Sequence, residues 1–96
     1  MIKCSLGIFA YNEEKNIGQL LNAIENQDLN QVSIEEVIVV SSNSTDRTDD
    51  IVREFARKNS KIRLIVQPER KGKSSAINLF LNEAKGDIFV IESADT

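Results

Sequence analysis

The stretch EVIVVSSNSTD, residues 36–46, decides the fold of this chain. It joins a nearly continuous run of β-branched residues, Val37 to Val40, to a polar cluster at residues 42–46. A run that is apolar at every position is typical of a parallel strand covered on both faces. Ser, Asn, Thr and Asp after such a run favour a turn and the start of a helix. The stretch therefore predicts a buried strand of a parallel sheet, with a helix that begins after the carboxyl end of that strand.

The same change from strand to helix pattern recurs along the chain. Strands are expected at residues 3–10, 36–41, 62–67 and 87–93. Between them, three helices are marked by apolar residues at helical spacing: Ile17, Leu20, Leu21 and Ile24; Ile51, Val52, Phe55 and Ala56; and Ala76, Ile77, Phe80, Leu81 and Ala84. Strands that alternate with helices imply right-handed crossovers. We therefore expect an α/β fold of the doubly wound, three-layer α/β/α type, with a parallel sheet.

Length and composition narrow the class of protein. The chain has 96 residues, 41% hydrophobic and 28% charged, which fits one globular domain and excludes a two-domain enzyme. Histidine is absent and Cys4 is the only cysteine, which excludes an internal disulfide and a Ser-His or Cys-His nucleophile. The net charge of -3 argues against a nucleic-acid partner. Residues 1–5 lack a secretory signal pattern, so we expect a cytoplasmic protein.

The candidate binding residues lie in the loops that follow the strands. In doubly wound folds, ligands bind outside the carboxyl ends of the strands. Here those positions are the polar segments 10–14, 41–46, 67–73 and 93–96. The chain has no Gly-x-Gly-x-x-Gly sequence, which disfavours a dinucleotide-dependent oxidoreductase.

The motifs in these loops, in their order and spacing, resemble those of the amino-terminal half of inverting, GT-A-type glycosyltransferases of family 2. They are Tyr11-Asn12-Glu13-Glu14, the turn at Ser41–Thr48, the stretch Gly72–Asn78, and Lys85-Gly86-Asp87 followed by Ser93-Ala94-Asp95. The resemblance covers the whole chain. It implies a Rossmann-like GT-A domain over residues 1–96 that binds a nucleotide-diphosphate sugar, and a truncation at its carboxyl end.

The resemblance also assigns candidate roles. The predicted substrate-binding residues are Ala10, Tyr11, Asn12, Glu13, Ser42, Lys73 and Asp95, and Asp95 is also the predicted ligand of a Mg or Mn ion. Tyr11 offers a ring on which a base can stack, and Lys73 adds positive charge at a helix start, where anions bind. Alternatives remain open: core packing for Tyr11, helix capping for Asn12 and Glu13, and simple solvent exposure for Lys73 and Asp95.

Three positions depart from the family's pattern. Phe9-Ala10 stands where the family commonly has Pro-Thr, Ser41-Ser42 replaces an acidic pair, and Ser93 replaces the first acid of the last motif. A serine hydrogen-bonds more weakly than a carboxylate. Two function classes therefore stay open: the donor-binding half of a sugar transferase, and a non-catalytic nucleotide-binding or interaction module of the same fold.

The resemblance places the catalytic base and the acceptor surface beyond Thr96. We therefore expect these 96 residues alone to be inactive in transfer; the acceptor is unknown, and a longer parent protein could be associated with a membrane. The family's strand order, 3-2-1-4, would make the last strand a bare edge with apolar residues 88–91. Exposed edges recruit partners, so self-association is expected there.

Overall fold

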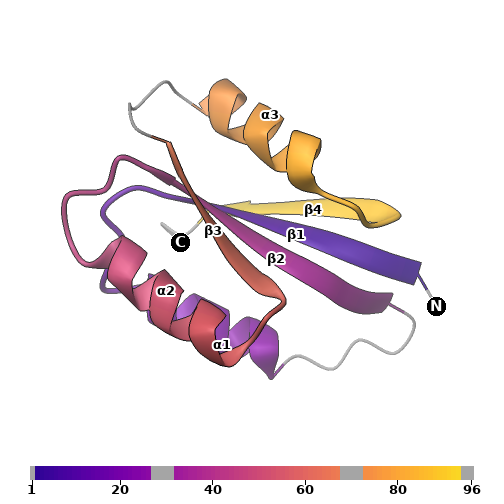
Figure 1. Cartoon of the computed structure of the whole chain (residues 1–96), viewed down its shortest axis with the longest axis horizontal. Coiled ribbons are helices and arrows are strands. Elements are labelled where there is room, and N and C mark those ends of the chain that lie inside the picture. Colours follow the sequence, from indigo (N-terminus) through magenta and orange to yellow (C-terminus); the bar gives the residue numbers. More distant parts are fainter. Residues whose placement is uncertain (1, 27–31, 68–72, 94–96) are drawn as a thin grey trace.

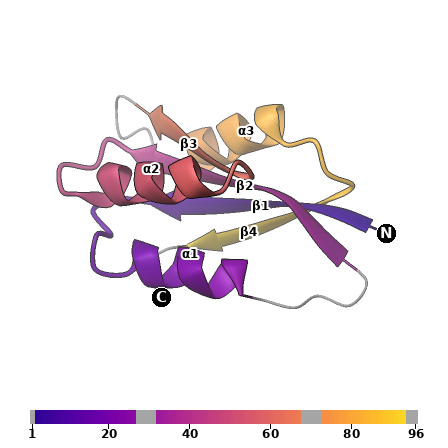
Figure 2. The ribbon, with the colours of Figure 1, turned by 60° about the horizontal axis from the view of Figure 1, so that its bottom comes forward.

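Strands and helices alternate along the chain, as the sequence predicts. The computed structural model describes residues 2–26, 32–67 and 73–93 (Figure 1). The elements are β1 (Ile2–Ala10), α1 (Ile17–Glu25), β2 (Val32–Ser42), α2 (Thr48–Lys58), β3 (Ile62–Gln67), α3 (Lys73–Glu83) and β4 (Ile88–Ser93). All strand pairs are parallel, and the sheet order is β3-β2-β1-β4. Helices α1 and α2 cover one face and α3 the other (Figure 2), which confirms the doubly wound, three-layer α/β/α fold.

Two apolar layers hold the helices against the sheet. The layer under α1 and α2 contains Leu6, Ile8, Ala10, Ile17, Leu21, Ile24, Val37, Val39, Val52 and Ile62. The layer under α3 contains Phe9, Ile38, Val40, Ala76 and Phe80. Alternate residues of β2 thus serve opposite layers, which explains why its central run is apolar at every position.

The α3 layer is built around Phe80, which is fully buried. Its ring lies edge-on to Phe9 and Phe89, at centroid distances of 6.3 and 6.0 Å. The ring also lies flat over Gly7: a Cβ atom at Gly7 would come within 2.9 Å of Phe80. Gly7 therefore provides the space that lets α3 approach the sheet.

Three details differ from the sequence expectations. Strand β2 begins at Val32 rather than at residue 36, because it pairs with β1 from Ile2 onward. Leu81 is 41% exposed rather than inward-facing, because it lies about 100° around the helix from Phe80. Helix α1 begins at Ile17, four residues later than an Asn12 cap would place it.

Strand β4 lies at an edge of the sheet, as expected, and its apolar side chains are exposed. Its residues Ile88, Phe89, Val90 and Ile91 are 40–47% exposed. The other edge of the sheet is β3. Over the three described ranges, no helix is both long and apolar enough to cross a membrane.

Candidate functional site

The loops that follow β1 and β2 meet at the carboxyl edge of the sheet (Figure 1). Three successive backbone N–H groups of the first loop donate to side chains of the second: Asn12 N to Ser44 Oγ at 3.1 Å, Glu13 N to Thr48 Oγ1 at 2.8 Å, and Glu14 N to Asp46 Oδ2 at 3.1 Å. The two loops are more than 30 residues apart in sequence. Their cross-links make them a single preorganised rim.

Asn12 bridges the two loops from the other direction. Its side-chain Oδ1 accepts a hydrogen bond from Thr45 N at 2.7 Å and lies 3.4 Å from Thr45 Oγ1. Its φ is 51°, in the left-handed region that Asn tolerates better than most residues. The helix-capping alternative for Asn12 is therefore wrong: the cap position of α1 is Asn16, which forms no side-chain cap hydrogen bond.

Asp46 is the anchor of the second loop. Its Oδ1 accepts from Thr48 N at 2.9 Å and from Thr48 Oγ1 at 2.5 Å, and Thr48 is fully buried. Burial favours a higher pKa for the Asp46 carboxyl, but hydrogen bonds from Thr48 and from Glu14 N outweigh it and hold that pKa below its usual range. Asp46 therefore stays ionised and holds the loops together.

Ser42 lies at the same edge, in a chain of side chains that reaches α3. Its hydroxyl donates to Gln67 Oε1 at 3.1 Å, and Gln67 Nε2 donates to Ser75 Oγ at 2.8 Å. Gln67 is buried, with 3% of its surface exposed. These hydrogen bonds connect the ends of β2 and β3 to the first turn of α3. Ser42, which replaces an acid of the family's pattern, is therefore held in place beside the rim.

The remaining predicted residues occupy different surroundings. Ala10 is buried in the layer under α1 and α2, so its main chain is the part that can meet a ligand. Tyr11 is 37% exposed, which rules out the core-packing alternative. The Glu13 carbonyl accepts from Asn16 N and Ile17 N, so Glu13 also shapes the turn into α1. Lys73 is the first residue of α3.

Asp95, the predicted metal ligand, lies outside the described residues. The strand that precedes it in sequence, β4, pairs with β1 up to Phe9↔Ser93, so it ends at the same edge as β1. Within residues 2–26, 32–67 and 73–93, no three His, Cys, Asp or Glu residues gather closely enough to hold a metal ion. The metal role of Asp95 stays a prediction.

Sequence reasoning missed two buried polar residues of this rim, Thr48 and Gln67. Both look like ordinary surface residues in the sequence. The spacing Asp46-x-Thr48 is a signal that was available, because a carboxylate two residues before a helical N–H is placed to accept from it. Gln67 lies in the predicted loop segment 67–73, but the sequence gave no sign that its side chain is buried, since its partners Ser42 and Ser75 come from other elements.

Comparison with known proteins identifies close similarities. The family model described as glycosyl transferase family 2 matches residues 5–96. A probable glycosyltransferase of Bacillus subtilis, YdaM, is 43% identical over 96 residues, which cover 97% of this chain and 23% of YdaM. The dolichol-phosphate mannosyltransferase of Pyrococcus furiosus is 38% identical over 96 residues, covering 98% of this chain and 26% of that protein. This chain therefore spans about a quarter of the length of these relatives.

Solved structures agree with this match. The mannosyltransferase PcManGT of Pyrobaculum calidifontis, in complex with GDP-Man and Mn²⁺, superposes with a TM-score of 0.84 at 36% identity. That match covers 96% of this chain and 27% of PcManGT. Residues 1–349 of Staphylococcus aureus TarS, in complex with UDP-GlcNAc, superpose with a TM-score of 0.83 at 30% identity, and the match covers 98% of this chain and 27% of that 1–349 chain.

Proposed function

We propose that this chain, which belongs to glycosyl transferase family 2, is the donor-binding part of a sugar transferase. The donor is a nucleotide-diphosphate sugar, and the sugar is transferred to an acceptor with inversion at the anomeric carbon. The GDP-Man and UDP-GlcNAc complexes of PcManGT and TarS support this donor class.

The observation that carries the proposal is the cross-linked rim at the carboxyl ends of β1 and β2. Three backbone donors and the Asn12 side chain hold the two loops in one geometry before any ligand arrives. Tyr11 follows β1 and Ser42 ends β2, so a stacking ring and a hydroxyl flank the rim. Preorganised polar groups beside an exposed ring are suited to a nucleotide base.

A divalent cation fits the chemistry of this edge. Strand β4 ends beside β1, and the Asp95 carboxylate is the hard oxygen ligand that Mg²⁺ and Mn²⁺ prefer. Such an ion would neutralise negative charge on the departing nucleoside diphosphate. In this proposal Asp95 holds the ion, Lys73 adds positive charge for the phosphates, and the remaining part of the enzyme supplies the catalytic base. The 96 residues alone are then inactive in transfer.

A second function is a nucleotide-binding or interaction module without catalysis. The observation in its favour is that Ser41-Ser42 and Ser93 replace acids in two motifs. Ser41 is buried and its Oγ lies 2.8 Å from Ser44 Oγ, so it serves the loop itself. The metal dependence of nucleotide binding separates the two functions.

Titration calorimetry of this chain with UDP and GDP, with and without Mn²⁺, tests the proposal. We expect one nucleotide to bind more tightly with Mn²⁺, and Asp95→Ala to remove that gain, an effect of about tenfold or more. Asp50→Ala, at an exposed aspartate paired with Arg53 on α2, is the matched control and leaves binding unchanged. Metal-independent binding in the unmodified chain supports the non-catalytic module. Absence of binding to both nucleotides refutes donor binding.

A further inference from the structure

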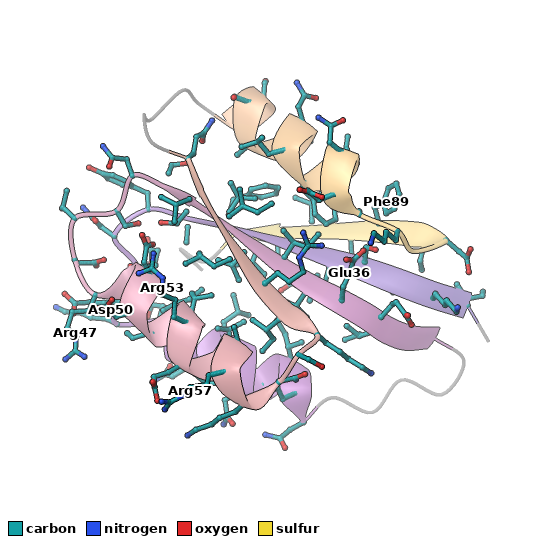
Figure 3. The ribbon with its side chains drawn as sticks, viewed as in Figure 1. Glu36, Arg47, Asp50, Arg53, Arg57 and Phe89 are labelled. Atoms are coloured by element: carbon teal, nitrogen blue, oxygen red, sulfur yellow. The ribbon has the colours of Figure 1, made fainter. Side chains whose placement is uncertain are left out.

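A second polar cluster lies toward the other end of the strands, away from their carboxyl ends, around the buried carboxylate of Glu36. Figure 3 shows Glu36 near Phe89 and far from Arg47 and Asp50, which lie at the start of α2. Glu36 is 7% exposed. Its Oε2 accepts from Ser5 Oγ at 2.7 Å and from Lys85 N at 2.6 Å. One carboxylate therefore binds β1 and the segment that joins α3 to β4.

The start of β4 is bound to β1 by three further hydrogen bonds. Gly86 N donates to Ser5 Oγ at 2.8 Å, Asp87 N donates to Lys3 O at 2.7 Å, and Lys3 N donates to Asp87 Oδ2 at 3.2 Å. Gly86 is required by this approach, because a Cβ there would lie 2.7 Å from Ser5 Oγ and 2.9 Å from Lys3 O. These contacts account for the Lys85-Gly86-Asp87 motif. We call Ser5, Glu36, Gly86 and Asp87 the β4 latch.

A β-bulge lies directly beside the latch. In the β1–β2 pairing, Cys4 faces Ile34 and Ser5 faces Glu36, so Glu35 is left out of the register. Glu36 lies two residues before Ile38 and so shares its face of the sheet, the α3 face, whereas Ile34, on the other side of the bulge, packs against the layer under α1 and α2. Strand alternation thus directs the Glu36 carboxylate to the α3 face, where Lys85 N and Ser5 lie.

Burying a carboxylate costs free energy unless it is well paired. The cation nearest to Glu36, Arg63, lies at 3.4 Å and is 40% exposed. Burial favours a higher pKa for Glu36, yet the Ser5 and Lys85 hydrogen bonds, with Arg63, hold that pKa below its usual range. Much of the stabilisation of this charge therefore comes from the groups that fix β4.

Strand β4 depends on such a latch because its own side chains do little to select a register. Residues Ile88 to Ile91 are all apolar, so both faces of the strand look alike, and all are at least 40% exposed. Register is weakly specified when neither face is distinctively buried. A slip of two residues keeps the same faces and moves the strand end by about 7 Å.

We propose that Ser5, Glu36 and Gly86 are positioning residues that fix the register of β4 on β1, and thereby the place of the carboxyl end of β4 at the donor site. The link to the donor site rests on the proposed function; the control of register does not. The latch thus acts from the far end of the strand, at a distance from any ligand.

Amide hydrogen exchange tests the control of register. We expect Gly86→Ala to lower the protection of β4 amides by about tenfold or more while β1–β2 amides keep theirs, because β4 opens as a separate unit. Gly18→Ala is the matched control, since a Cβ at Gly18 meets Ile51 and Phe55 at ordinary distances of 3.6 and 3.9 Å. Unchanged β4 protection in Gly86→Ala, or an equal loss over the whole sheet, would overturn the proposal.

Substitutions at Glu36 give a graded test in a chain that keeps Gly86. Glu36→Gln retains a carbonyl oxygen for Ser5 Oγ and Lys85 N, so we expect β4 protection close to that of the unmodified chain. Glu36→Ala removes the acceptor and lowers β4 protection. Ser5→Ala, a milder change, lowers it less and serves if Glu36→Ala does not fold. Equal β4 protection in Glu36→Ala, Ser5→Ala and the unmodified chain contradicts the latch.

Nucleotide titration tests the link to the donor site. We expect Gly86→Ala to lose about tenfold of the Mn²⁺-dependent gain in affinity while it keeps the metal-independent part. A purely structural defect would weaken both parts together. If the unmodified chain binds no nucleotide, the proposed function is wrong, and hydrogen exchange still tests the control of register by the latch. If the unmodified chain binds nucleotide and Gly86→Ala binds it equally well, the link between the latch and the donor site is wrong.

Discussion

Strands β2 and β4 flank β1 on its two sides and have nearly the same apolar character, yet their surroundings are opposite. Val37, Ile38, Val39 and Val40 of β2 are at most 3% exposed, whereas Ile88, Phe89, Val90 and Ile91 of β4 are 40–47% exposed. This difference arises because β2 has a strand on each side and an apolar layer on both faces, whereas β4 has one neighbouring strand, β1, and little helix cover. An apolar run predicts a strand but does not say what covers it.

The two strands are accordingly held in place by different means. Burial on both faces fixes β2, because any slip would remove its side chains from two apolar layers. In β4, Phe89 packs against Phe80 of α3. The position of the strand otherwise depends on the polar contacts just before it. Substitutions in the two strands should therefore have unequal effects.

The largest difference is expected from matched truncations. Ile38→Ala, at a fully buried site, should lower the free energy of unfolding by about 2–5 kcal/mol. Ile91→Ala, at a residue that is 44% exposed, should lower it by less than about 1 kcal/mol. Urea unfolding followed by circular dichroism measures both. Equal losses would mean that β4 is as buried as β2.

Strand β1, which lies between β2 and β4, offers a sharper test at Gly7. Gly7→Ala should destabilise the fold by about 1–3 kcal/mol, because the new Cβ meets the buried Phe80 ring at 2.9 Å. Phe80→Leu should reduce the added cost of Gly7→Ala, since a smaller side chain leaves room. The four chains form a double-mutant cycle in urea. Additive losses would show that Gly7 and Phe80 do not compete for space.

The acid response tests the charged groups that fix the β4 start and the rim. Glu36 and Asp46 have folded-state pKa values below their ordinary values of 4.5 and 3.8, so the unfolded chain binds more protons. Their stabilisation is present above those values and is lost as the pH falls through the lower folded-state values. Glu36→Gln should flatten this loss. Urea unfolding between about pH 7 and 3 measures this loss of stability. A free energy of unfolding that does not change with pH would contradict the prediction.

The smallest effect on stability is expected from substitutions in the exposed edge strands. There we expect the substitution to alter self-association instead. We propose that the chain self-associates through the β4 edge, because four successive apolar residues, 88–91, are exposed there. Val90→Lys should keep the chain monomeric, whereas Val66→Lys, at a 41% exposed residue of the other edge strand β3, should not. Light scattering at high concentration measures the mass. A monodisperse monomer without substitution would refute self-association.

Much of the fold could be predicted because local patterns determine it. The strand at Val37–Val40 and the alternation of elements led to the parallel sheet, and the resemblance led to its order. The prediction for Leu81 was wrong because an apolar residue at helical spacing was taken as inward-facing when the helix buries a narrower face. The strand start at Val32 was missed because residues 32–36 lack an apolar run.

The site could be predicted only in part. The loops were predicted because they follow strands, and Ser42 because of the resemblance, but the Asn12 bridge and the Gln67 contact depend on partners brought together by folding. Glu36 was missed because a glutamate at the start of a strand looks solvent-exposed. The Lys85-Gly86-Asp87 motif, to which the sequence analysis gave no binding role, was the available clue to its partners. The roles of Lys73 and Asp95 remain predictions.

The most direct test of the central claim is the site at which a nucleotide binds. NMR amide shifts recorded during titration with UDP or GDP in the presence of Mg²⁺ report on the backbone N–H groups along the chain, Pro68 excepted. We predict that the largest changes fall in residues 11–14 and 42–46, with little change at Ser5 and Glu36. Changes concentrated around Ser5 and Glu36, or no change at saturating nucleotide, would contradict donor binding at the carboxyl edge.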